Sequence, residues 1–205
     1  MAIDIFLLAS WIGSAAFALS GFIIGARKHL DIMGVFVLAF ITANGGGVIR
    51  DVLIGRTPMA LQDISAIILV LVTFGFGMVL YWAKYLDVEK RGLFVISDSV
   101  GLVAFSVTGA LVGIEAELNL FGMTVLSFLT ATGGGILRDI LVNEVPSVFR
   151  SEFYGSVSIL VAFALFALHY MGLENELTIG GVFVAALFLR LIAHRMGWHL
   201  PRLKF

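Results

Sequence analysis

Apolar residues run along the chain in seven long stretches that short polar segments separate. The stretches cover about residues 3 to 25, 30 to 56, 63 to 86, 92 to 114, 119 to 143, 153 to 172 and 177 to 195. A helix that crosses a bilayer needs about 20 mostly apolar residues, and every stretch is close to that length. The pattern therefore predicts an all-α integral membrane protein with seven transmembrane helices.

Composition agrees with a protein that lies almost entirely in lipid. The 205 residues are 60% hydrophobic and 13% charged, whereas roughly a quarter of the residues of a soluble domain are charged. The net charge of -1 gives no reason to expect a nucleic-acid partner. The N-terminus has no basic segment and carries Asp4, so we expect the first helix to remain in the protein rather than be cleaved as a signal peptide.

Basic residues between the stretches predict the orientation in the membrane. If the helices alternate in direction, one side receives Arg27, Lys28, Lys84, Lys90, Arg91, Arg150, Arg195, Arg202 and Lys204, whereas the other receives Arg56. Basic connections stay in the cytoplasm. We therefore expect a multi-pass protein of the inner (plasma) membrane, with the N-terminus outside and the C-terminus cytoplasmic.

The connections on the predicted outer side are acidic. They carry Asp63, Glu115, Glu117, Glu174 and Glu176. Carboxylates at a mouth concentrate cations, and this is one interpretation. The alternative is that they are ordinary solvated charges of loops.

Two segments of the chain repeat each other at a constant offset of 88 residues. Residues 13 to 58 and 101 to 146 share 19 identities in 46 positions without a gap. The identities include glycines, an arginine, an aspartate and a proline, which shared hydrophobicity alone would not match. We divide the single membrane domain, residues 1–205, into a first three-helix repeat (1–88), a second (89–176) and a seventh helix with a tail (177–205).

Each repeat holds three crossings, which is an odd number, so the second repeat enters the membrane from the opposite face. The two repeats are therefore expected to be inverted. Inverted repeats with interrupted helices at matched positions point to a transport site near the midplane. The seventh helix lies outside the repeat, where it closes a lateral opening or forms a subunit contact.

Each repeat also contains a glycine triplet. The triplets are Gly45, Gly46 and Gly47, and Gly133, Gly134 and Gly135. Each glycine costs about 1 kcal/mol of helix propensity relative to alanine, so we expect the second and fifth helices to kink or unwind there. Non-helical backbone at membrane depth is tolerated only inside protein or beside water. We therefore favour a role in lining a pathway over the alternative, close helix packing.

Other small residues of the repeat have a different interpretation. Gly21 and Gly25, and likewise Gly109 and Gly113, are spaced as in helix-packing motifs, and for these pairs we favour packing. Thr42 and Thr130 precede the triplets. They either satisfy backbone groups freed by the break or line the route.

An arginine and an aspartate follow each triplet. Charged side chains at membrane depth usually face a cavity and pair with one another. Adjacent residues of a helix point in different directions, so we predict crossed ion pairs, Arg50 with Asp139 and Arg138 with Asp51. Such pairs either bracket a pathway or only lock the two helices together.

Three further polar residues lie within the apolar stretches. Asp98 is either wetted near the inner interface, which we favour, or part of a pore. Arg190 and His194 stand near the inner end of the last helix, where extension of the side chain to the interface explains them.

The sequence gives little support to catalysis. It has no His, Cys, Asp and Glu cluster at metal-ligand spacing and no serine in a nucleophile elbow. We expect no enzyme, no cofactor and no permanently bound metal.

The doubled glycine triplet with its Arg-Asp pair and following proline, in a chain with seven crossings, resembles the prokaryotic branch of the trimeric intracellular cation channel (TRIC) family. The resemblance covers essentially the whole chain. It implies two inverted three-helix repeats plus a seventh helix, a homotrimer, and a pore for monovalent cations, chiefly potassium, in each protomer. It also implies that the triplets are kinked and that Arg50, Asp51, Arg138 and Asp139 are pore-associated.

Three functions remain open at this stage. The resemblance favours a channel for potassium or sodium ions. Inverted repeats with broken helices are typical of secondary transporters, and the bacterial domain is also labelled a glycine transporter. The alternative is therefore a secondary transporter of a small solute such as glycine. A trimeric scaffold without conduction is a third possibility.

Overall fold

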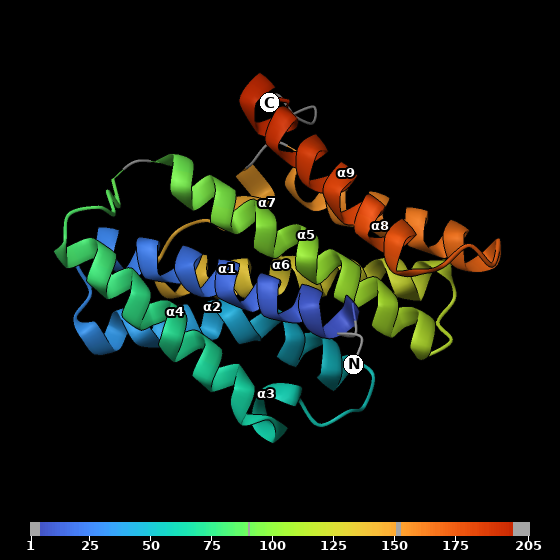
Figure 1. Cartoon of the computed structure of the whole chain (residues 1–205), viewed down its shortest axis with the longest axis horizontal. Coiled ribbons are helices and arrows are strands. Elements are labelled where there is room, and N and C mark those ends of the chain that lie inside the picture. Colours follow the sequence, from blue (N-terminus) through green and yellow to red (C-terminus); the bar gives the residue numbers. More distant parts are fainter. Residues whose placement is uncertain (1–4, 90, 151–152, 199–205) are drawn as a thin grey trace, which may run out of the picture.

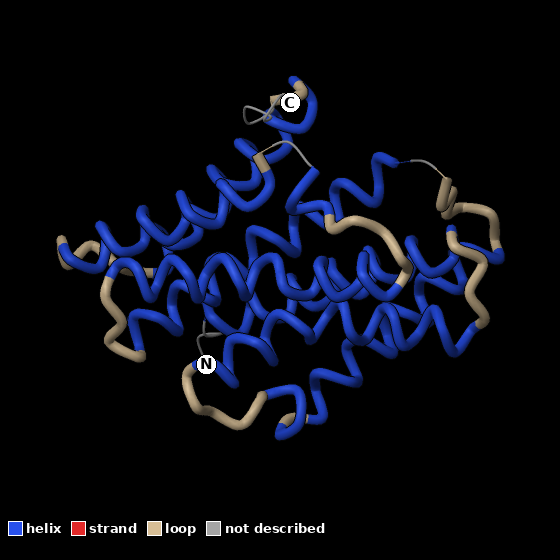
Figure 2. Tube along the Cα trace, turned by 180° about the vertical axis from the view of Figure 1, so that it is seen from behind, coloured by secondary structure: helices blue, strands red, loops and turns tan. Residues whose placement is uncertain are grey.

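The computed structural model describes residues 5–89, 91–150 and 153–198. Asp4, Lys90, Arg202 and Lys204, which the expectations above use, lie outside the described residues. The described part consists of helices and connections and contains no strand (Figure 2). The helices are α1 (Ile5–Arg27), α2 (Ile32–Leu53), α3 (Met59–Gln62), α4 (Ile64–Trp82), α5 (Arg91–Glu115), α6 (Leu120–Leu141), α7 (Ser147–Arg150), α8 (Tyr154–Tyr170) and α9 (Glu176–Met196).

The long helices coincide with the apolar stretches of the sequence. Six of them, α1, α2, α4, α5, α6 and α9, are long and apolar enough to cross a membrane. Helix α8 is also apolar but has 17 residues. The single-turn helices α3 and α7 follow Pro58 and Pro146 and were not predicted.

Helices α1, α2, α5 and α6 form the centre of the bundle (Figure 1). Helix α4 packs against α1 and α2, whereas α8 and α9 pack against α5, and α8 also contacts α6. The sequence colours of Figure 1 show that α1 runs from the end of the bundle near the N-terminus toward the opposite end, and that α5 runs the reverse way beside it.

Local structure repeats at the offset of 88 residues. Asp31 caps α2 by accepting a hydrogen bond from the backbone of Gly34, and Asn119 caps α6 in the same way through Gly122. The carboxylate or amide oxygen satisfies a backbone N–H that has no partner inside the helix. The two segments thus share their local structure as well as their residues.

The spaced glycines bring neighbouring helices close together. A Cβ on Gly21 would lie 2.7 Å from the Ala39 Cα of α2. In the second half, a Cβ on Gly109 would lie 2.8 Å from the Ser127 Cα of α6. Real Cβ atoms do not approach so closely, so both positions need glycine. The expected packing role of these glycines is confirmed.

Candidate functional site

The glycine triplets lie where α2 and α6 cross. A Cβ on Gly46 would overlap the carbonyl oxygen of Thr130, and a Cβ on Gly134 would overlap that of Thr42. Both helices remain helical through their triplets, so the expected unwinding is wrong, whereas the other alternative, a kink, stays a prediction. The weak helix propensity of glycine is outweighed by the close contact that its missing side chain permits, since tertiary packing supplies most helix stability in proteins.

The last glycine of each triplet has different neighbours. A Cβ on Gly47 would lie 3.9 Å from an Arg50 guanidinium nitrogen. A Cβ on Gly135 would lie 3.7 Å from the corresponding nitrogen of Arg138 and 3.2 Å from the Tyr154 hydroxyl. The triplet therefore has two functions: its first two residues allow the helices to touch, and its third leaves space beside the arginine.

The two threonines belong to the same crossing. Thr42 and Thr130 are fully buried. Each hydroxyl donates to a carbonyl one turn earlier in its own helix, on Leu38 and on Leu126, at 2.6 Å. The prediction that they satisfy freed backbone groups is wrong because the helices are intact. Their burial places them inside the crossing rather than on a cavity wall.

Arg50 forms a compact polar cluster at the end of α2. Its Nε donates to Asp51 at 2.8 Å, and the other oxygen of Asp51 accepts the backbone N–H of Met59 at 3.0 Å. The guanidinium also lies over the ring of Phe6, 5.5 Å from its centroid. Arg50 and Asp51 are 4% and 3% exposed, so their charges neutralise each other away from bulk water.

Arg138 forms the matching cluster at the end of α6. Its Nε donates to Asp139 at 2.8 Å, and Asp139 accepts the backbone N–H of Ser147 at 2.7 Å. The guanidinium lies over the ring of Phe94 at 4.9 Å. Each of these contacts repeats one made by Arg50 at the offset of 88 residues.

The crossed ion pairs are therefore wrong. Each arginine pairs with the aspartate that follows it in its own helix. The expectation considered only the directions of the two Cα–Cβ bonds. An arginine side chain is long and flexible enough to fold back, and the single-turn helix after each proline turns an N–H onto the same aspartate and holds it in place.

Asp98 gives the Arg138 cluster a second carboxylate that the Arg50 cluster does not have. Its carboxylate accepts a hydrogen bond from Arg138 Nη1 at 2.6 Å, and the same nitrogen lies 2.5 Å from the Ser20 hydroxyl. Asp98 is 3% exposed but lines a large cavity at this end of the bundle, so both interpretations, a wetted residue and a pore residue, stay predictions. The position that corresponds to Asp98 in the first half is Ser10.

Arg190 is a second correction. It is 4% exposed and stacks over the ring of Tyr154 at 5.0 Å. It does not extend to the exposed surface but stacks on the aromatic ring, which is a favourable partner for a buried cation, and borders a large cavity. Helix α9 thereby contributes a cation next to the Arg138 cluster.

A large cavity adjoins the Arg50 cluster, and we call it the α3 cavity. It has a volume of about 710 Å³ and is lined by parts of α1, α2, α3, α5 and α9 and their connections. Its charged lining residues are Arg50, Asp51, Arg56, Glu115 and Glu174. Two of the predicted outer acidic residues, Glu115 and Glu174, thus face a cavity.

A second cavity adjoins the Arg138 cluster, and we call it the α7 cavity. It has a volume of about 590 Å³ and is formed by α1, α5, α6, α7, α8 and α9. Its charged lining residues are Arg27, Lys28, Asp98, Asp139, Glu144, Arg150 and Arg190, with His194 beside them. Basic side chains outnumber acidic ones here, whereas acidic side chains outnumber basic ones in the α3 cavity.

At each cavity an exposed ion pair joins the two halves of the chain. At the α3 cavity Arg56 meets Glu115 at 3.3 Å, and at the α7 cavity Lys28 meets Glu144 at 2.5 Å. Lys28 lowers the pKa of the Glu144 carboxyl below its ordinary value of 4.5 by hydrogen bonding and charge. Arg56 and Glu144 correspond at the offset of 88 residues but carry opposite charges, whereas their partners Glu115 and Lys28 do not correspond to each other.

Several residues of these clusters were not predicted. Phe6, Phe94, Ser20 and Tyr154 gave no signal as single residues. The pair Phe6 and Phe94 obeys the offset of 88 residues, and extending the alignment toward the N-terminus would have found it. Tyr154 replaces an alanine of the first half, so the repeat could not identify it.

Comparison with known proteins identifies the class of this bundle. The glycine transporter family matches residues 7–84 and 95–170. A membrane protein of Deinococcus radiodurans, UPF0126, is 38% identical over 199 residues, which is 93% of this chain and 88% of the relative. The chain is thus a membrane protein related to others of its own length.

Solved structures specify the family. A TRIC cation channel superposes with a TM-score of 0.86 at 33% identity and covers 98% of both chains. The TRIC orthologue of Rhodobacter sphaeroides gives a TM-score of 0.84 at 33% identity, with 94% of this chain and 98% of that chain covered. The chain belongs to the prokaryotic branch of the trimeric intracellular cation channel family.

Proposed function

We propose that this protein is a channel for monovalent cations, chiefly potassium, with a pore inside each protomer. The observation that carries the proposal is the pair of large cavities lined in part by charged side chains, each next to a buried arginine cluster, in a fold similar to that of TRIC cation channels. The cavities act as vestibules at the two ends of the pore. The contact between α2 and α6 and the two arginine clusters form the narrow part between them.

In this proposal the chain has two inverted three-helix repeats. The opposite directions of α1 and α5 (Figure 1) and the matched clusters support the inversion. Helix α8 is the sixth crossing and α9 the seventh. The 17 residues of α8 span about 26 Å at 1.5 Å per residue, which is slightly less than a hydrocarbon core of about 30 Å.

The α3 cavity faces the outside and the α7 cavity faces the cytoplasm of a cell with this protein in its inner membrane. The basic residues of the α7 cavity support this orientation, because basic segments stay in the cytoplasm. The acidic excess of the α3 cavity raises the local concentration of cations at the outer vestibule. The functional unit is a homotrimer, as the solved relatives are described as trimeric channels.

Single-channel recording in planar bilayers tests the channel function. Purified protein is recorded while potassium, sodium and chloride are varied separately. We expect unitary current steps whose reversal potential follows the potassium gradient and not the chloride gradient. Current carried by chloride, or no unitary steps with protein shown to be inserted, would refute the proposal.

The second candidate is a secondary transporter of glycine or a similar small solute. The match to the glycine transporter family favours it. A transporter predicts saturable glycine uptake into proteoliposomes that is driven by a proton or sodium gradient, without unitary currents. Neither function requires catalysis or a cofactor.

A further inference from the structure

Three open spaces lie one after another along α5, and a closed segment interrupts them. The α7 cavity touches α5 at Val95 and Asp98, whereas the α3 cavity touches it near its end, at Ile114 and Glu115. A smaller pocket of about 70 Å³, which we call the α4 pocket, touches α5 at Phe105. Residues 99 to 104 line none of these three spaces.

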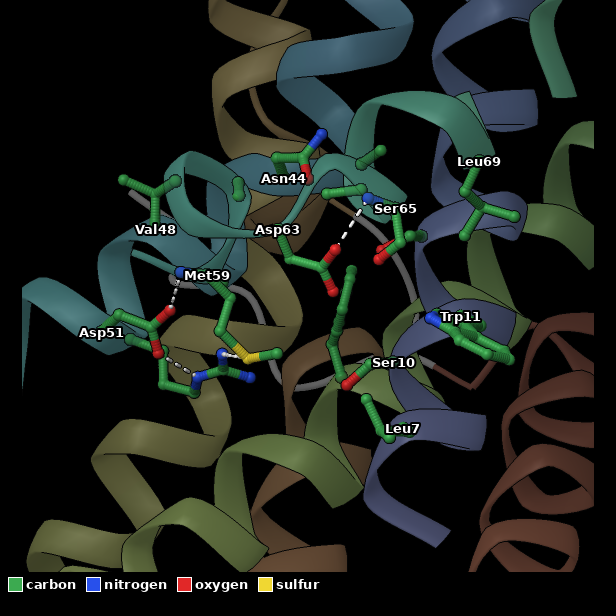
Figure 3. A pocket seen from close by; sticks show the side chains of 17 residues that line it. Leu7, Ser10, Trp11, Asn44, Val48, Asp51, Met59, Asp63, Ser65 and Leu69 are labelled. Atoms are coloured by element: carbon green, nitrogen blue, oxygen red, sulfur yellow. Dashed lines mark hydrogen bonds and ion pairs between the residues drawn. The ribbon is translucent and has the colours of Figure 1, made fainter. Parts of the chain in front are cut away.

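The α4 pocket belongs to the α3 end of the bundle. It lies between α1, α2, α3 and α4 (Figure 3). Arg50, Asp51 and Met59 line both this pocket and the α3 cavity, so the two spaces are neighbours. Because it touches Phe105, near the middle of α5, the α4 pocket reaches deeper into the bundle than the α3 cavity does.

Helix α1 shows the same interruption. Phe6 lines the α3 cavity, Ser10 and Ser14 line the α4 pocket, and Ile24 and Arg27 line the α7 cavity. Residues 15 to 23 line none of these three spaces. Two helices from the centre of the bundle therefore agree on where the open space stops.

Apolar side chains fill the closed segment, and we call them the aromatic plug. The ring centroids of Phe17 and Phe105 lie 5.3 Å apart. Leu102, Ala131 and Tyr154 complete the cluster. All five residues are at most 3% exposed, so the plug is closely packed and dry.

The plug separates the α4 pocket from the α7 cavity. Phe105 lines the pocket, and Asp98 lines the cavity. Asp98, Leu102 and Phe105 are spaced at i, i+4 and i+7, which puts them on one face of α5. The rise from Asp98 to Phe105 is about 10 Å at 1.5 Å per residue. A cation in this segment would lose its water without gaining a polar partner, and apolar constrictions close channels in this way.

The plug has a part that the duplication repeats and a part that it does not. Phe17 and Phe105 correspond at the offset of 88 residues. Tyr154 corresponds to Ala66, and Ala66 lines the α4 pocket. A small side chain at this position thus leaves open space in the first half, whereas the tyrosine fills the matching space in the second half.

Tyr154 is also the plug residue that gains most from moving. Its hydroxyl is buried and has no hydrogen-bond partner in the part of the chain that the structure describes. A buried polar group without a partner costs free energy. Tyr154 lines the α7 cavity as well, so rotation into this cavity would give the hydroxyl access to water.

We propose that the aromatic plug is the gate of the pore, and that Tyr154 opens it by turning into the α7 cavity. This inference rests on the channel function proposed above. In the closed state described here, cations reach the α4 pocket from one end and the α7 cavity from the other, and the rings between them exclude water. In the open state the hydroxyl of Tyr154 is hydrated and the space beside Phe17 and Phe105 fills with water.

Single-channel recording of Phe105→Asn tests the gate. A polar side chain hydrates the plug, and we expect the ratio of open to closed time to rise at least about tenfold. Phe105→Leu keeps the plug apolar and should gate like wild type. The control Phe121→Asn makes the same change at an exposed ring of α6 and should have no effect. A folded Phe105→Asn protein with the wild-type ratio would refute the proposal.

Tyr154→Phe should shift gating in the opposite direction. The variant keeps the ring and removes the hydroxyl that gains water on opening. We expect the ratio of open to closed time to fall about three- to tenfold, the value of one net hydrogen bond. The control Tyr170→Phe removes an exposed hydroxyl and should leave the ratio unchanged. A ratio that rises in Tyr154→Phe would contradict the assigned motion.

Thiol protection tests the dry plug without ion flux. The chain contains no cysteine, so a single cysteine can be placed in the α4 pocket, by Ser10→Cys, or in the plug, by Leu102→Cys. The full-length protein is treated with silver ion, which binds thiols, and is then denatured and labelled with a maleimide. We expect silver to protect Leu102→Cys at least about tenfold more slowly than Ser10→Cys. Addition of Phe105→Asn to Leu102→Cys should remove this difference.

The two measurements separate failure of the gate from failure of the channel function. Equal protection of Ser10→Cys and Leu102→Cys in protein with normal unitary currents would show a wet plug and would refute the gate alone. Slow protection of Leu102→Cys in protein without unitary currents would confirm a dry segment and refute the channel function, and with it the role of the plug as a gate.

Discussion

The Arg50 and Arg138 clusters share a geometry but differ in charge. In both, an arginine folds onto the next residue, the aspartate accepts a backbone N–H from a single-turn helix, and a phenylalanine ring lies under the guanidinium. Only Arg138 also meets a second carboxylate, Asp98, and the hydroxyl of Ser20. The duplicated backbone thus fixes the contacts common to both halves, and single substitutions give each half its own electrostatic character.

The side chains that differ between the two clusters also determine how much open space borders each arginine. Arg50 lines two cavities, whereas Arg138 has no exposed surface and Asp98 and Tyr154 occupy the room beside it. In the proposed channel, a cation at the α3 end would pass an arginine that borders open space. At the α7 end it would pass an arginine held between two carboxylates.

The largest effect is expected from substitutions at the contact between α2 and α6. Gly46→Val and Gly134→Val each place a side chain against a carbonyl oxygen of the other helix. Because backbone cannot move aside as a side chain can, we expect a loss above the usual range of about 1–3 kcal/mol for overpacking and little folded protein in detergent by size-exclusion chromatography. The two variants should be equally damaged. Gly75→Val in α4, where nothing lies within 4 Å, is the control and should fold.

Removal of each arginine tests the difference between the clusters. Arg138→Met leaves Asp98 and Asp139 buried without their cation, and we expect a loss of about 3–5 kcal/mol in the free energy of unfolding. Arg50→Met leaves only Asp51, which keeps its bond to Met59 and borders a cavity, so the loss should be smaller. Denaturant unfolding of the purified variants measures both. Equal losses would mean that Asp98 does not distinguish the halves.

Asp98→Ser would make the second half resemble the first. We expect a loss of about 1.5–3 kcal/mol, the range for hydrogen bonds to charged groups. A double-mutant cycle of Asp98→Ser with Arg138→Met should give a clear coupling energy. The same cycle between Arg50→Met and Asp139→Asn should give less than about 0.5 kcal/mol. A larger value in the second cycle would restore the crossed pairing that the structure contradicts.

The smallest expected effect concerns the bridge between Lys28 and Glu144. Because Lys28 lowers the Glu144 pKa below 4.5, the bridge stabilises the folded protein above pH 4.5. This contribution is lost as the pH falls through the lowered value. Lys28→Met should therefore lower the melting temperature slightly near neutral pH and not in more acidic solution. A difference between the variants that persists at acidic pH would show that Lys28 acts through packing rather than charge.

Helix positions and the duplication were predictable because lipid imposes a length and a composition on every spanning segment. The apolar stretch at about 119 to 143 and helix α6 (Leu120–Leu141) agree within a few residues. The triplet residues and the charged pairs were also found, because polar and flexible residues are costly at membrane depth. Their partners were not. The ion-pair partner depends on the side-chain rotamer, whereas helix periodicity predicts only the direction of the Cα–Cβ bond.

The glycine triplets show why the expected unwinding was wrong. Three glycines weaken an isolated helix. The sequence alone did not reveal that a second helix packs against them. In the structure the Gly46 backbone and the Thr130 backbone meet directly, which replaces the missing side-chain contacts.

The adjacent pairing of each arginine with its own aspartate also affects how the chain is made. Arg50 carries its counter-charge on the same segment, so the second helix leaves the ribosome already neutralised within one turn. It can enter the bilayer without waiting for the fifth helix to be synthesised. The folded pairing thus keeps the contact that is already available within one segment, so neither half needs the other to neutralise its arginine.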